Sequence, residues 1–72
     1  METGTVRFYN QEKGYGFISP DSGGAEVFVH VSTVELAGLA SLQPGDRVRY
    51  ETIADREGRN AAVGLSRLDP VG

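Results

Sequence analysis

Turn-forming residues recur about every ten positions along this chain and divide it into short segments. The ten glycines stand mostly at segment ends, where strand-rich chains turn. The segments between them are rich in β-branched and aromatic residues, and we expect strands at residues 5–10, 15–19, 26–31, 47–54 and 60–68. Five short strands separated by turns indicate a small all-β sandwich or barrel. A closed or nearly closed barrel leaves the fewest exposed strand edges, so we expect that architecture.

The stretch between the third and fourth strands carries local signals of its own. Ser32 and Glu35 have the spacing of a capping box, which predicts one or two turns of helix before Gly38. Pro44 and Gly45 follow in the order of a type II turn, because proline sets φ and glycine accepts the positive φ that follows. Alternation in the fourth strand predicts one face made of Val48, Tyr50 and Thr52.

The length and composition restrict how the fold is stabilised. At 72 residues the chain fits one domain, residues 1–72, with a small core. It has no cysteine, and His30 is its one histidine, so neither disulfides nor a zinc cage of thiolates and imidazoles can reinforce that core. We expect no metal and no cofactor. Because no apolar run approaches the ~20 residues of a membrane helix and residues 1–4 show no signal-peptide pattern, we expect a cytoplasmic protein without a membrane partner. We also expect a monomer.

The formal net charge of −3 argues against a protein that binds polyanions through charge alone. Nucleic-acid binding would have to depend more on base stacking than on phosphate neutralisation, or on segregated charges. Arg7 and Lys13 stand beside the aromatic segments and are candidates for phosphate contacts, whereas Arg56 and Arg59 fall in a charged hairpin loop and are weaker candidates. About three such contacts would give a salt slope of about −2 on single strands.

Strand alternation gathers aromatic side chains on one face of two neighbouring segments. In residues 13–19, one face has Lys13, Tyr15, Phe17 and Ser19, and the other has Gly14, Gly16 and Ile18. In the next segment three valines share a face that suits a core, and Phe28 and His30 share the other. If the two strands pair, they form what we call the aromatic patch: Tyr15, Phe17, Phe28 and His30. Such a patch binds unstacked bases with little regard for sequence, at about 1–3 kcal/mol for each stacked base.

Burial in the core is the alternative interpretation of these aromatic residues. Five of the six aromatic residues fall between Phe8 and Phe28, whereas a core would spread them more evenly. The valines of residues 27–31 already supply a core face. The spacing therefore favours a surface patch over a core.

Residues 13–18, with the sequence Lys-Gly-Tyr-Gly-Phe-Ile, resemble the RNP1 motif of RNA-binding proteins. Residues 27–32 resemble RNP2 but follow RNP1, whereas RNP2 comes first in an RRM domain, and the chain lacks the two long helices of an RRM. The order, the length and the sequence of residues 8–10 resemble the bacterial cold-shock proteins instead, from residue 4 to about 68. The resemblance implies a five-stranded antiparallel OB-type β-barrel that binds single-stranded RNA or DNA.

The same resemblance implies which residues contact the nucleic acid. It puts Lys13 and the aromatic patch at stacking or contact positions, Phe8 at a further stacking position and Arg7 near the backbone path. With the hairpin candidate added, the candidate nucleic-acid-binding residues are Arg7, Phe8, Lys13, Tyr15, Phe17, Phe28, His30 and Arg59. Simple alternation puts Phe8 on the same face as Val6, so the first strand requires a bulge or a strong twist.

Four positions depart from the family pattern. The family usually has Trp at Phe8, Phe at Val31, an aromatic residue at Leu39 and Gly-Pro at Gly58-Arg59. The first three changes reduce the stacking surface, so Val31 and Leu39 are poor site candidates. We expect weak, pyrimidine-tolerant binding of a few nucleotides, and nothing in the sequence separates RNA from DNA as the target.

Two other classes of function are alternatives to nucleic-acid binding. A catalytic triad needs a base, an orienting carboxylate and an oxyanion hole, and nothing around His30 and Ser32 marks one, so we expect no enzyme. The serious alternative is a protein-binding barrel that uses the same aromatic patch as its interface, which the net acidity favours. The family resemblance implies an RNA chaperone that keeps transcripts unstructured without ATP, or a regulator of transcription or translation.

Overall fold

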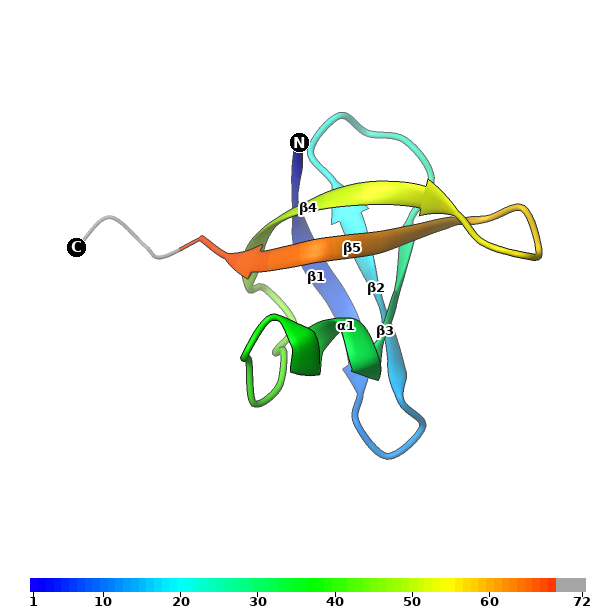
Figure 1. Ribbon diagram of the computed structural model, residues 1–72. Coiled ribbons are helices and arrows are strands. Elements are labelled where there is room, and N and C mark those ends of the chain that lie inside the picture. Colours follow the sequence, from blue (N-terminus) through cyan, green and yellow to red (C-terminus); the bar gives the residue numbers. More distant parts are fainter. Residues whose placement is uncertain (69–72) are drawn as a thin grey trace.

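Five strands close into a barrel, and one short helix follows the third of them (Figure 1). The computed structural model describes residues 1–68. The elements are β1 (Glu2–Asn10), β2 (Tyr15–Pro20), β3 (Val27–His30), α1 (Val31–Leu36), β4 (Arg47–Ala54) and β5 (Asn60–Arg67). Around the barrel the strands follow the order β1-β2-β3-β5-β4, and β4 pairs with β1 to close the ring. Within the described residues, no helix is long and apolar enough to cross a membrane.

The predicted five-stranded OB-type barrel is confirmed, but its strands are not antiparallel throughout. The pairs β1·β2, β1·β4, β2·β3 and β4·β5 are antiparallel, whereas β3 and β5 are parallel where Phe28 pairs with Ala61. An odd number of strands in a closed ring cannot alternate direction at every step, so at least one neighbouring pair must be parallel. The chain between β3 and β5 passes through α1 and β4, which lets β5 return in the direction of β3.

Several element ends differ from the prediction. β1 begins at Glu2 rather than at residue 5, because its first residues pair with β4. β3 ends at His30, since Val31 already belongs to α1. The capping box predicted at Ser32 is wrong: His30 is the N-cap, and its side chain accepts a hydrogen bond from the backbone N–H of Ser32. A histidine side chain thus fills the role expected of the serine hydroxyl.

The barrel interior is filled mainly by aliphatic side chains. The buried hydrophobic residues are Val6, Ile18, Val27, Val29, Val34, Leu42, Val48, Tyr50, Ala62 and Leu65. Val48 and Tyr50 are fully buried, as alternation along the fourth strand predicts. The register of β1 against β2 shifts between Val6 and Phe8, which confirms the predicted bulge. This bulge keeps Val6 inside the barrel and turns Phe8 outward.

β1 and β2 come close together at Gly16. A Cβ at Gly16 would collide with the carbonyl oxygen of Phe8 and lie 2.9 Å from the Cα of Tyr9. Both are backbone atoms, which cannot turn away as the end of a flexible side chain can. Glycine at this position therefore sets the distance between the two strands that carry Phe8 and Tyr15.

Gly16→Ala should destabilise the fold by about 1–3 kcal/mol, because β1 must shift to admit the methyl group. Urea unfolding, with the free energy extrapolated to water, measures the change. Gly24→Ala is the matched control, since a Cβ there meets nothing within 4 Å, and it should change stability by less than about 0.5 kcal/mol. Equal stability of the two variants would show that the strands tolerate wider spacing.

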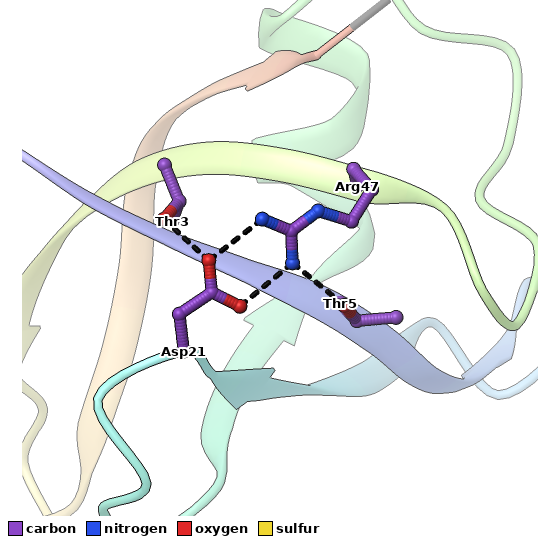
Figure 2. Close-up of polar contacts among 4 residues, drawn as sticks. All are labelled: Thr3, Thr5, Asp21 and Arg47. Carbon is purple, nitrogen blue, oxygen red and sulfur yellow. Dashed lines mark hydrogen bonds and ion pairs between the residues drawn. The ribbon is translucent and has the colours of Figure 1, made fainter. Parts of the chain in front are cut away.

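A polar cluster on the outside of the barrel joins β4 to β1 and to the residue after β2 (Figure 2). Asp21 accepts two hydrogen bonds from the guanidinium of Arg47, at 2.6 and 2.7 Å, and a third from the hydroxyl of Thr3 at 2.7 Å. Arg47 also donates to the hydroxyl of Thr5 at 2.9 Å. These bonds, chiefly those from Arg47 and then that from Thr3, lower the pKa of Asp21 to about 2.

The stabilising effect of Asp21 should depend on pH between about 4 and about 2. A carboxyl group with a lower pKa in the folded state takes up protons more readily when the chain unfolds. Its contribution is therefore complete above the ordinary Asp pKa of about 4 and is lost as the pH falls through about 2. Asp21→Asn should lower the thermal unfolding midpoint at pH 7, and the difference from wild type should shrink on acidification.

Glu12→Gln is the control for this experiment. It removes the same charge at an exposed turn residue, outside the cluster that Arg47 organises. It should not reproduce the pH-dependent difference. If the unfolding midpoint of Asp21→Asn stays below that of wild type by the same amount from pH 7 to pH 2, the ionised Asp21 carboxylate is not the stabilising group.

Candidate nucleic-acid interface

The pairing of β2 with β3 brings the aromatic patch together on the outside of the barrel. Tyr15 pairs with His30 and Phe17 pairs with Phe28, so the four side chains share one face of the sheet. The centroid of the Phe28 ring lies 6.0 Å from those of Tyr15 and Phe17 and 6.3 Å from that of His30. The Tyr15 and Phe17 centroids are 5.8 Å apart. These separations are typical of aromatic pairs, so the rings form one continuous surface.

Phe8 extends this surface from β1. After the bulge, Phe8 pairs with Phe17 in the register of β1 and β2, and its ring centroid lies 5.8 Å from that of Tyr15. Phe8 is 41% exposed. The bulge predicted from its conflict with Val6 thus brings a fourth large ring to the outer face.

The aromatic patch lines an open groove and not the core. The valines that alternate with Phe28 in β3, Val27 and Val29, are buried, whereas Phe28 is half-buried and His30 is exposed. The groove has a volume of about 430 Å³ and is lined by Lys13, Gly14, Tyr15, Phe17, Phe28, His30 and Arg59. The predicted surface location of these aromatic residues is therefore confirmed, and the core interpretation is wrong for them.

His30 uses one of its ring nitrogens to cap α1. Its Nδ1 lies 3.1 Å from the backbone nitrogen of Ser32 and 2.9 Å from the Ser32 hydroxyl oxygen. A backbone N–H can only donate, so Nδ1 carries no proton when it accepts this bond, and the neutral ring carries its proton on Nε2. The cap therefore sets the tautomer of His30 and leaves Nε2–H as a donor on a ring that lines the groove.

The predicted cationic residues take different positions. Lys13 lines the groove at the turn after β1, where its backbone N–H donates to the Asn10 side chain at 3.0 Å. Arg59 reaches the groove from the loop between β4 and β5, with its guanidinium carbon 4.1 Å from the centroid of the Phe28 ring. Arg7 instead forms an ion pair with Glu26 at 3.0 Å and does not line the groove. Arg59 thus contacts the aromatic patch and lines the groove, whereas Arg7 does not line it.

An apolar extension of the patch onto β5 and β4 was missed by the sequence analysis. Ala61 pairs with Phe28 on one side and with Ile53 on the other. Residues paired in this way direct their side chains to the same face, and Ile53 is 53% exposed. The sequence contains a signal for this extension, because alternation puts Ile53, a large apolar residue, on the outward face of its strand with Arg49 and Glu51.

Two positions where the family usually has aromatic residues lie outside the groove lining. Val31 is the half-buried first residue of α1, and Leu39 packs against the buried core. Neither side chain lines the groove. Among residues 1–68, the rings that contact one another on this surface come from β1, β2 and β3.

Together, the closed five-stranded barrel and the exposed rings on its neighbouring strands define an OB-type barrel with an aromatic face. Residues 2–67 match the family described as the 'Cold-shock' DNA-binding domain, and the chain belongs to this family. The resemblance seen in the sequence is thereby confirmed.

Individual relatives are similar along most of their length. A protein of Sinorhizobium fredii named as a probable cold shock protein is 54% identical over 57 residues, which cover 79% of this chain and 83% of the relative. The cold shock protein CspA of Rhizobium meliloti is 47% identical over 66 residues, 90% of this chain and 96% of the relative. The major cold shock protein of Micrococcus luteus is 48% identical over 62 residues, 86% and 92% of the two chains.

His30 both caps α1 and lines the groove, and two substitutions measure what the cap contributes to stability. His30→Ala should destabilise the fold by about 0.5–2 kcal/mol, because the Ser32 N–H loses its acceptor. His30→Asn keeps an acceptor at the N-cap and should stay close to wild-type stability. Urea unfolding measures both variants. If the alanine and asparagine variants prove equally stable, the cap contributes nothing measurable.

Proposed function

We propose that this protein binds single-stranded RNA or DNA by stacking unpaired bases on the aromatic patch and Phe8. The observation that carries this proposal is the continuous set of outward-facing rings on β1, β2 and β3, with centroids 5.8–6.3 Å apart. Every base has a π-face, so adjacent rings offer adjacent stacking positions to a flexible strand. Membership of a family described as DNA-binding supports the same function.

Polar groups around the rings supply the remaining contacts in this proposal. The Nε2–H of His30 donates to a base carbonyl or a phosphate oxygen, and Lys13 neutralises a phosphate at the edge of the groove. Arg7 contacts the backbone path beyond Phe8, and Arg59 borders the groove. Because Phe8 offers a smaller ring than the Trp usual in the family, we expect weak binding that tolerates pyrimidines.

Charge contributes little to this mode of binding. Arg7 pairs with Glu26, and Arg59 pairs with Asp55 and Glu57, so a phosphate that reaches either arginine replaces a carboxylate. Such an exchange releases fewer counterions than neutralisation of a phosphate by an unpaired cation. We therefore expect a salt slope shallower than the value of about −2 for three free phosphate contacts, and closer to −1.

Binding of this kind has a direct consequence for folded RNA. A protein that binds only unpaired bases shifts the equilibrium from hairpins to single strands by mass action, without ATP. We therefore propose that the protein acts as an RNA chaperone or as a regulator of transcription or translation, as a monomer and without catalysis or a cofactor.

Removing one ring of the patch should weaken binding to oligo-dT and oligo-U. Phe17→Ala and Phe28→Ala should each reduce the affinity about fivefold to 150-fold, because each deletes a stacking position worth about 1–3 kcal/mol. Quenching of the intrinsic tyrosine fluorescence during titration at two salt concentrations gives the affinity and the salt slope together.

Leu36→Ala is the matched control, because Leu36 is a large apolar residue that is 90% exposed and does not line the groove. It should bind as wild type does. If Phe17→Ala and Phe28→Ala also bind as wild type does, the patch is not the binding surface. If the wild-type protein binds neither oligonucleotide, the protein-binding alternative becomes the better account of the same rings.

A further inference from the structure

The guanidinium of Arg59 lies against the Phe28 ring. Its central carbon is 4.1 Å from the ring centroid, within the distance of a cation–π contact. Arg59 and Phe28 both line the groove, so the guanidinium fills space above a ring that the proposed function assigns to a base. Tyr15 and Phe17 flank the same ring at 6.0 Å, and the buried Val27 and Val29 point to the other side of β3.

Two carboxylates of the same loop hold Arg59 in this position. Its Nε donates to the Asp55 carboxylate, and its Nη2 lies 2.9 Å from an oxygen of Glu57. Asp55 is itself fixed, because its other oxygen accepts the backbone N–H groups of Glu57 and Arg59 at 2.9 and 3.1 Å. The hydrogen bond from Arg59 is also the main cause of a lowered pKa of Asp55. The guanidinium is therefore anchored at both ends of its planar group.

We propose that Arg59 is a built-in competitor for the Phe28 stacking position, anchored by Asp55 and Glu57, that a base must displace before it stacks. The proposal rests on the proposed function and adds a residue that sets the affinity of this site. A base and a guanidinium are both planar groups that bind the face of an aromatic ring, so they cannot occupy that face together. Arg59 must therefore move away from the Phe28 ring before a base can stack on that face.

Each contact of Arg59 is weak, so the expected effect is moderate. An exposed cation–π contact and exposed ion pairs are each small, and the phosphates of the ligand recover part of the interaction once Arg59 moves. Displacement of the arginine should therefore lower the affinity for single strands by about threefold to tenfold relative to a chain with an open Phe28 site.

Arg59→Ala tests the proposal through the direction of its effect. Removing a cation from a protein that binds a polyanion ordinarily weakens binding. Here we expect Arg59→Ala to bind oligo-dT about threefold to tenfold more tightly than wild type at the same salt concentration. Arg59→Gln, which keeps the length of the side chain without its charge, should also bind more tightly. A cooperative thermal transition for each variant shows that the barrel is intact.

Two controls tie the effect to the Phe28 ring. Arg56→Ala removes the same charge from the same loop and should not bind more tightly, because Arg56 does not line the groove. In the Phe28→Ala background, Arg59→Ala should give no gain, since the contested ring is absent. Tighter binding by Arg56→Ala to the same degree, or a gain that persists without Phe28, would overturn the proposal.

The failure of this inference is distinguishable from failure of the proposed function. If wild type binds oligo-dT and Phe28→Ala weakens that binding, the function stands. Unchanged or weaker binding by Arg59→Ala then overturns the inference alone and makes Arg59 an ordinary contact residue. If no variant binds oligo-dT, the function fails, and the inference fails with it.

Discussion

The small interior of a five-stranded barrel decides where the aromatic side chains of this protein lie. Valines, one isoleucine, two leucines, one alanine and Tyr50 form the buried set, and the interior of so small a barrel is filled by side chains. Since neighbours in a strand point to opposite faces, burial of Val27 and Val29 requires Phe28 and His30 to face outward. A slip of one residue would reverse both faces, so the same register that forms the core also forms the aromatic patch.

Two local features of β1 and β2 maintain this register. The bulge between Val6 and Phe8 lets one strand contribute both a core residue and an outward ring, which uninterrupted alternation does not allow. Gly16 lets the backbone of β1 approach β2 closely enough for Phe8 to reach Tyr15. The aromatic surface therefore depends on the β1 bulge and on Gly16 as well as on the aromatic residues themselves.

Because the barrel closes with an odd number of strands, one strand pair is parallel, and this pair sets which residues lie at the edge of the aromatic patch. The parallel contact between β3 and β5 brings Ala61, and through it Ile53, beside Phe28. It also directs the loop between β4 and β5 toward the groove, with the charged groups of Arg59, Asp55 and Glu57. The cations near the rings are thus largely matched by carboxylates, which explains how an acidic chain presents an aromatic surface without a strongly basic field around it.

The sequence by itself determined the class of fold, the membership of the aromatic patch and the need for a bulge near Phe8. The fold class follows from five short strands separated by turns, together with the resemblance to the cold-shock proteins, and the aromatic patch follows from alternation with a period of two. The bulge follows from the conflict between that alternation and the outward position of Phe8 that the resemblance implies. The tertiary structure alone decided that β3 and β5 are parallel, that His30 rather than Ser32 caps α1, and that Arg59 covers Phe28 while Arg7 pairs with Glu26. Three of these contacts join residues far apart in the chain, at distances that barrel closure and loop geometry set. The cap is local, but it depends on β3 ending at His30 and α1 beginning at Val31, which alternation does not determine.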